Sequence, residues 1–115
     1  LYIIMYTYRA KLIRVIDGDT IDAIIDLGFD VWVKKRIRLN GIDAPETRTK
    51  NLTEKEHGLK AKAFLKEIMG SPDDPFVLQS HGVGKYGRCL GTIFKNDVNI
   101  CHKLVNEGYA EEYKK

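Results

Sequence analysis

The sequence predicts a small, β-rich α+β domain, and three observations lead to this fold class. Apolar and polar residues alternate with the period of a β-strand in three successive segments within residues 8–39. Apolar residues then recur at helical spacing within 53–68. Two further short apolar segments follow before a second helical segment near the end. The 115 residues, 43% of them hydrophobic, suffice for one core, so we expect one domain over 1–115 with its core in about 8–110.

Three strands are expected first, because β-branched residues occupy the apolar positions and turn residues separate the segments. The predicted strands span residues 8–16, 21–27 and 31–39. In the first strand, Leu12 and Ile13 interrupt the strict alternation, which predicts a β-bulge there. In the third strand, the alternation places Arg38 on the face opposite the apolar residues.

The helix that follows is expected to begin at a capping box, with Thr53 as the N-cap and Glu56 three residues later. Gly58 lies inside this helix and costs about 1 kcal/mol relative to alanine. Asp97 or Asn99 is expected to cap a second helix. The remaining predicted elements are a short strand at 76–78, a glycine-rich loop at 81–87, a strand at 88–94 and the second helix over 100–105.

The charge pattern is mildly basic. The net charge of +3 at pH 7 favours an anionic partner. Basic residues gather at 34–38, 48–50 and 85–88, although any one of these clusters could be an ordinary solvated face. The apolar segment 1–8 lacks the basic start and the cleavage site of a signal peptide, and it is too short to cross a bilayer. We therefore expect a monomer with no membrane partner, and an intracellular protein unless a precursor segment has been removed.

The cysteines and histidines do not have the spacing of a zinc site or of a nucleophilic triad. Cys89 and Cys101 are isolated, with no C-x-x-C pair and no histidine at zinc-ligand spacing. They could form a disulfide, although two half-buried thiols are the commoner arrangement in a chain that has a core. His57, His81 and His102 stand at unrelated spacings, so neither zinc nor triad chemistry is expected.

Three charged segments carry the functional information. They are residues 17–20 (D-G-D-T), residues 38–47 (R-L-N-G-I-D-A-P-E-T) and residues 85–88 (K-Y-G-R). Pro45 prevents the second segment from being helical throughout, so its carboxylates and its arginine lie on a loop. Such a loop suits a cation and phosphate site, because carboxylates bind hard cations and guanidinium binds phosphate. In this order and spacing, the three segments resemble the staphylococcal nuclease (thermonuclease) family over nearly the whole chain.

The resemblance implies a five-stranded, OB-type Greek-key barrel with two helices. The family's domain continues into a third, C-terminal helix, which we expect to be absent because the sequence ends at Lys115. The resemblance also implies a Ca²⁺ site. Asp19 and Asp43 resemble its direct ligands, the main-chain carbonyl of Ala44 resembles a third ligand, and Asp17 resembles an outer-shell acid. The family's type member has threonine in place of Ala44, a change that removes a hydroxyl but keeps the carbonyl.

The same resemblance assigns the catalytic and substrate-binding residues. Glu46 resembles the general base, and Arg38 and Arg88 resemble two arginines that clamp the phosphate. Lys85 and Tyr86 match positions that hold a terminal phosphate and stack on the nucleotide. Without the resemblance, Glu46 would be an ordinary surface glutamate and each arginine a solvated charge at a strand edge.

The implied function is that of a Ca²⁺-dependent endonuclease acting on single-stranded DNA and RNA. Water would attack phosphorus and the 5′ oxygen would leave, giving 3′-phosphate ends. Tyr109 and Tyr113 lie near the family's later aromatic binding positions and are further candidates for substrate binding. The alternative is a non-catalytic nucleic-acid-binding OB-fold module, since barrels of this type also bind strands without cutting them. The acids beside an anionic ligand favour the enzyme, because a pure binding module has no use for them.

Overall fold

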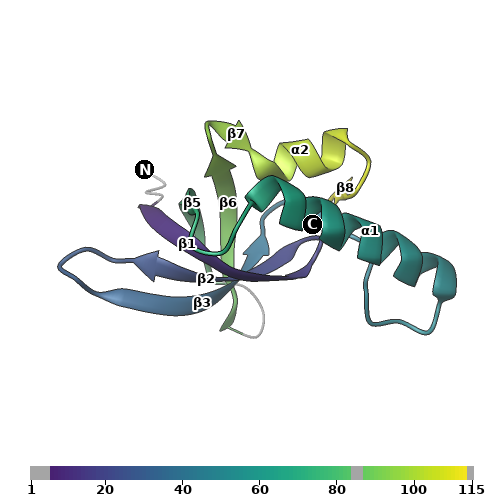
Figure 1. The fold of residues 1–115 in the computed structure, drawn as a ribbon, viewed down its shortest axis with the longest axis horizontal. Coiled ribbons are helices and arrows are strands. Elements are labelled where there is room, and N and C mark those ends of the chain that lie inside the picture. The colour runs from purple at the N-terminus through teal and green to yellow at the C-terminus, as the bar shows by residue number, and fades with distance from the viewer. Residues whose placement is uncertain (1–5, 84–86, 114–115) are drawn as a thin grey trace.

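The computed structural model describes residues 6–83 and 87–113, so the predicted substrate-binding residues Lys85 and Tyr86 lie outside the described part. The strands are β1 (Tyr6–Asp17), β2 (Thr20–Asp26), β3 (Trp32–Leu39), β4 (Ile42–Asp43), β5 (Pro75–Val83), β6 (Cys89–Lys95), β7 (Val98–Asn99) and β8 (Glu111–Glu112), and the helices are α1 (Leu52–Met69) and α2 (Ile100–Asn106). Figure 1 shows their arrangement. No helix in the described part is long and apolar enough to cross a membrane.

Five strands close into a barrel. Antiparallel pairing joins β3, β2, β1, β5 and β6 in that order, and β7 lies at the outer edge of β6. β3 then pairs in parallel with β6, with Ile37 opposite Cys89 and Leu39 opposite Gly91. This pairing closes the sheet on itself. The prediction of a five-stranded OB-type barrel with two helices is confirmed, and residues 6–83 and 87–113 contain no third α-helix.

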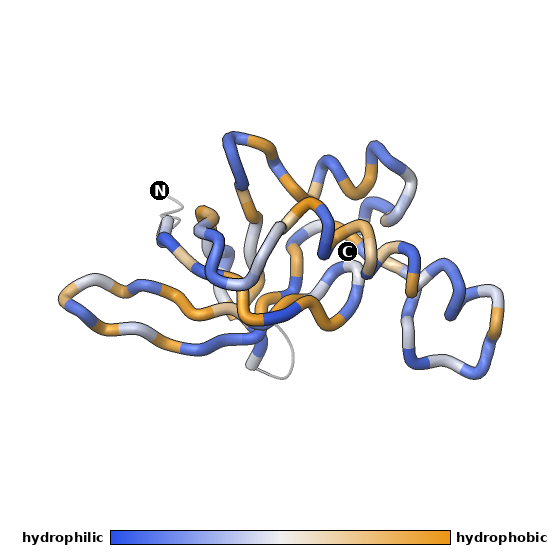
Figure 2. Tube along the Cα trace, viewed as in Figure 1, coloured by the Kyte–Doolittle hydropathy of each residue, from blue (hydrophilic) through white to orange (hydrophobic). Residues whose placement is uncertain are grey.

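The inner faces of the strands and one side of each helix form the core. Hydrophobic and hydrophilic residues alternate along the first three strands, as Figure 2 shows. The largest fully buried side chains are Ile21, Ile37, Leu39, Leu65, Met69, Leu78, Ile93, Ile100 and Leu104. The β2–β3 hairpin extends beyond the barrel (Figure 1), so Leu27, expected inside the second strand, lies past its end and is exposed.

The predicted β-bulge in the first strand is confirmed. Leu12 pairs with Ala23, whereas Arg14 pairs with Asp22, so Ile13 is the extra residue. The bulge leaves Arg14 on the outer face of the sheet, directly across from Asp22. Arg14 also lines a groove on this side of the sheet.

The N-cap predicted for α1 is wrong. Asn51 caps the helix instead, and its side chain accepts a hydrogen bond from the main-chain N–H of Glu54 at 3.1 Å. Thr53 lies within the first turn. Asparagine is also a preferred N-cap residue, and this cap lies two residues before the predicted one. α2 is capped by Asn99, one of the two predicted caps, which accepts from the N–H of His102 at 3.1 Å.

Strand β5 is longer than expected and includes the first part of the predicted glycine-rich loop. The extension has a physical reason, because β5 pairs with β1 along one edge and with β6 along the other. Cys89 and Cys101 are both free thiols in the structure, Cys89 half-buried and Cys101 buried. Burial raises the pKa of the Cys101 thiol.

A two-stranded sheet of β4 and β8 ties the end of the described chain to the charged loop. Ile42 pairs with Glu112 and Asp43 pairs with Glu111. The main-chain N–H of Tyr113 donates to the carbonyl of Gly41 at 2.8 Å. Two-residue strands carry no recognisable period, so the sequence did not predict them. Their pairing places the segment after α2 directly beside Asp43.

Candidate active site

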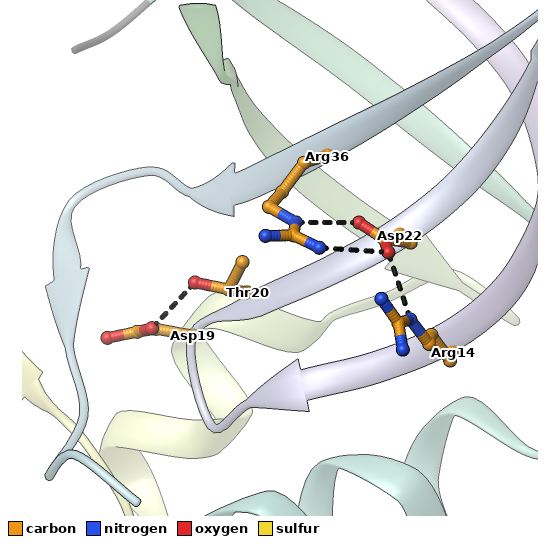
Figure 3. Close-up of polar contacts among 5 residues, drawn as sticks. All are labelled: Arg14, Asp19, Thr20, Asp22 and Arg36. Atoms are coloured by element: carbon orange, nitrogen blue, oxygen red, sulfur yellow. Dashed lines mark hydrogen bonds and ion pairs between the residues drawn. The ribbon is translucent and has the colours of Figure 1, made fainter. Parts of the chain in front are cut away.

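The turn between β1 and β2 fixes the carboxylate of Asp19. This residue is 8% exposed. Its Oδ1 accepts a hydrogen bond from the Thr20 hydroxyl at 2.9 Å (Figure 3), and its Oδ2 accepts one from the main-chain N–H of Ala44 at 2.8 Å. A buried carboxylate needs such partners, since an unpaired buried charge is strongly unfavourable. Asp19 therefore joins the β1–β2 turn to the loop that follows β4.

Gly18 allows this turn to lie close to its neighbours. A Cβ atom on Gly18 would lie 2.7 Å from the Cβ of Ala61 in α1 and 3.0 Å from the Cβ of Ala44. These distances are too short for packed carbon atoms, so a larger residue would push the turn away from the helix and the loop. The small size of Gly18, Ala44 and Ala61 thus allows the turn, the loop and α1 to pack closely around the site.

Arg38 joins two of the predicted motifs. Its Nη2 lies 3.5 Å from Oδ2 of Asp19 and 3.2 Å from Oδ1 of Asp43, and its Nη1 donates to the carbonyl of Leu39 at 2.8 Å. The Arg38 side chain is 16% exposed, and Ile37 and Leu39 on either side of it point into the core. The predicted orientation of Arg38, opposite the apolar residues of its strand, is confirmed.

The carboxylates of Asp19 and Asp43 are chemically suited to bind a hard cation. Both approach one positively charged group, and the Asp43 side chain is 61% exposed, which leaves it accessible. All the predicted donors, including the carbonyl of Ala44, are oxygen atoms, the ligands that Ca²⁺ prefers. Asp17 accepts a hydrogen bond from the Thr47 hydroxyl. Within the described residues, no three His, Cys, Asp or Glu side chains gather closely enough to form a metal site by themselves.

The loop that carries Glu46 lies against α1 at Gly58. A Cβ atom on Gly58 would lie 2.4 Å from the carbonyl oxygen of Glu46 and 2.8 Å from that of Pro45. Gly58 is unfavourable for the helix, but only glycine lets the helix approach the loop this closely. The side chain of Glu46 is exposed.

Other predicted residues of the described part line two separate cavities. Arg88 and Asp17 line a groove of about 810 Å³. Asp43 lines a separate cleft of about 620 Å³ together with Tyr109. The ring of Tyr109 stacks on that of Phe64 in α1, with the centroids 4.3 Å apart and the planes at 17°. Tyr109 therefore packs the C-terminal segment against α1, while the exposed Tyr113 stays a candidate for substrate binding.

Comparison with known proteins identifies the family. A family model described as "Staphylococcal nuclease homologue" matches residues 36–115. This chain is a member of that family. It is 38% identical over 98 residues to the thermonuclease of Staphylococcus intermedius (84% of this chain, 55% of that protein), and 32% identical over 100 residues to that of Staphylococcus hyicus (87% and 56%). It is 28% identical over 116 residues to the micrococcal nuclease of Shigella flexneri (93% and 59%).

The chain spans little more than half the length of these curated relatives. The family match covers the charged loop, Glu46 and Arg88, whereas Asp17 and Asp19 precede it. The relatives' names describe whole proteins, of which this chain matches only part.

Sequence reasoning missed one charged cluster in this staphylococcal nuclease homologue. Asp22 is buried on β2 between Arg14 on β1 and Arg36 on β3, as Figure 3 shows. Arg36 donates to both carboxylate oxygens at 2.8 and 3.2 Å, and Arg14 donates at 3.1 Å. The bonds from Arg36 and, to a lesser extent, Arg14 lower the pKa of Asp22, although burial opposes them. Strand register is the signal that could have revealed this cluster, since the three residues lie directly across from one another.

Proposed function

We propose that this chain is a nuclease that hydrolyses phosphodiester bonds in DNA and RNA with the help of Ca²⁺. Family membership and the names of the similar proteins support the nuclease class. The observation that carries the proposal is the approach of Arg38 to both Asp19 and Asp43. This arrangement gathers the phosphate-binding and cation-binding chemistry at one point, where phosphodiester hydrolysis needs both.

Different residues of the chain would have different roles in this reaction. Asp19, held by Thr20 and Ala44, provides a carboxylate in a fixed position, and Asp43 provides an accessible one. Ca²⁺ bound there would polarise the phosphate and promote ionisation of a nearby water. The guanidinium groups of Arg38 and Arg88 would donate to the phosphate oxygens as negative charge develops on them.

Glu46 is the proposed general base. Its exposed carboxylate would take a proton from the attacking water as the oxygen of that water bonds to phosphorus. The bond from phosphorus to the 5′ oxygen would break, and the departing oxygen would take a proton from solvent. As the family resemblance implies, the phosphate then remains on the 3′ side.

The substrate is proposed to be a single strand of DNA or RNA, because an open site with clustered cations admits an unpaired, flexible backbone. Lys85 and Tyr86, predicted to hold its phosphate and base, remain predictions.

A non-catalytic binding module of the same fold is the second candidate. One observation favours it: Arg38 already donates to Leu39 and contacts both Asp19 and Asp43, as a purely structural arginine would. A binding module would gain nothing from acids at the phosphate, however, because carboxylates repel an anionic strand. Cleavage separates the two candidates directly.

The experiment is to incubate single-stranded DNA and RNA with the protein in Ca²⁺, Mg²⁺, Zn²⁺ and excess chelator. Ca²⁺ should support the fastest cleavage, because zinc prefers nitrogen and sulfur ligands and Mg²⁺ requires a stricter geometry. Asp43→Asn should raise the Ca²⁺ concentration needed for half-maximal rate by about tenfold or more, since it removes one charged ligand. Asp97→Asn, at an exposed turn, is the matched control. Undiminished cleavage in chelator would disprove the calcium role.

A further inference from the structure

A basic groove lies beside the candidate site. It is the groove of about 810 Å³ that Arg88 and Asp17 line. Its other cations come from separate parts of the fold: Arg14 from β1, Lys34, Lys35 and Arg36 from β3, Arg48 from the loop after Glu46, and Lys62 from α1. Cations that converge from a sheet, a loop and a helix form a concave surface suited to an anion.

The carboxylates that line this groove already have partners. Asp22 accepts hydrogen bonds from Arg14 and Arg36, so its charge offsets only part of theirs. Asp17 accepts from the Thr47 hydroxyl. In the part of the chain that the structure describes, Arg48 and Lys62 form no ion pair with a carboxylate. The groove therefore presents a net positive charge to solvent.

The groove borders the candidate site without including Asp19, Arg38 or Asp43 in its lining. Thr20, whose hydroxyl donates to Asp19, lies in its wall, as does Arg88. A chain of phosphates that passed the site would meet these cations next. A flat anionic surface such as a membrane would not reach the interior of a groove walled by a helix and a sheet, whereas a flexible strand would.

We propose that this groove binds the backbone of single-stranded DNA or RNA beyond the bond at the candidate site, with Arg48 and Lys62 contacting its phosphates. The inference rests on the proposed function, because it assumes that the strand passes Asp19 and Arg38. It adds an extended strand-binding surface and makes affinity depend on the length of the strand.

The test measures binding by fluorescence anisotropy, with labelled oligothymidylates of about 4 and about 16 nucleotides, the range of site sizes for such barrels. It is done in chelator over a series of salt concentrations, so binding is read without cleavage. The variant is Arg48→Gln with Lys62→Gln. Its matched control is Lys66→Gln with Lys103→Gln, which removes the same charge from two lysines that line neither the groove nor the cleft beside Asp43.

The groove variant should bind the longer strand roughly tenfold more weakly, and its salt slope should fall by about 1.4, at about 0.7 per phosphate contact. The groove variant should lose less affinity for the shorter strand. The control variant should match wild type in affinity and in salt slope. Unchanged affinity and slope in the groove variant, or an equal loss in the control, would overturn the proposal. Wild-type protein that binds in this manner but never cleaves would contradict the proposed function and leave the groove assignment intact.

Discussion

Replacing Arg38 tests whether its guanidinium group binds the phosphate, because the contacts of Arg38 depend on a forked side chain. One nitrogen donates to Leu39 while the other contacts both Asp19 and Asp43. Arg38→Lys keeps the charge but cannot make these contacts together. We expect turnover to fall by about 10²- to 10³-fold, the cost typical of losing one transition-state donor, with a smaller loss of strand affinity. Arg88→Lys should behave in the same way.

Steady-state kinetics and anisotropy on the same strand would separate the two effects for Arg38→Lys and Arg88→Lys. Near-native turnover in both variants would show that these arginines are not phosphate ligands.

Asp22 gives a pH-dependent prediction for stability. Its pKa is lowered in the folded state, chiefly by the hydrogen bonds from Arg36, so its stabilising effect is present at neutral pH. That effect is lost as the pH falls below the ordinary aspartate value of 3.8 towards the folded-state pKa. Asp22→Asn should lower the free energy of unfolding by about 1–2 kcal/mol at pH 7, with a smaller difference at pH 3. Urea unfolding at both pH values measures this, and an equal difference at both would contradict it.

The individual site residues differ in how far the sequence reveals them. Asp19, Arg38, Asp43 and Ala44 lie in short motifs, and the structure brings all four together. The charged pairs of Asp22 depend on which residues lie opposite each other in neighbouring strands. The bulge at Ile13 helps to set that register, so linear spacing alone does not show these pairs.

A substitution at Gly58 tests whether the close contact between α1 and the charged loop matters for stability and activity. Gly58→Ala should improve helix propensity by about 1 kcal/mol, but its methyl group would overlap the backbone of Pro45 and Glu46. We expect the variant to be less stable by about 1–3 kcal/mol, as in other overpacked sites, and to cleave more slowly because the loop moves.

Lys55→Ala, at an exposed position of the same helix, is the control for Gly58→Ala. Thermal unfolding and cleavage would be measured for both. A Gly58→Ala variant with higher stability and unchanged activity would show that this close approach has no role in holding Glu46.

The long elements follow from the sequence, and the two-residue strands do not. The strands of 8–16 and 31–39 and the helix near 53–68 have enough residues for a clear period. The β4–β8 pairing involves four residues far apart in sequence, and tertiary contact alone creates it. The start of α1 depends on a choice between Asn51 and Thr53 that local spacing leaves open.

For the whole molecule, the barrel arranges pieces of distant sequence around one centre. The β1–β2 turn supplies Asp19, the end of β3 supplies Arg38, and α1 supports the loop of Glu46. Periodicity predicts a β-rich domain. It does not predict closure of the barrel, because closure depends on pairing between β3 and β6, which are far apart in the chain. The expectation of a closed barrel comes from the family resemblance. The catalytic function of this arrangement rests on whether Glu46 acts as a base.

The most direct measurement compares wild type with Glu46→Gln on one labelled single strand, recording cleavage in Ca²⁺ and binding by anisotropy. The substitution is nearly isosteric and the side chain is exposed, so folding should survive. Cleavage should fall by about 10²- to 10⁴-fold, the usual effect of losing a general base, while salt-sensitive binding holds or strengthens. A Glu46→Gln variant as fast as wild type, or a wild-type chain that binds the strand and never cuts it in Ca²⁺, would contradict the account.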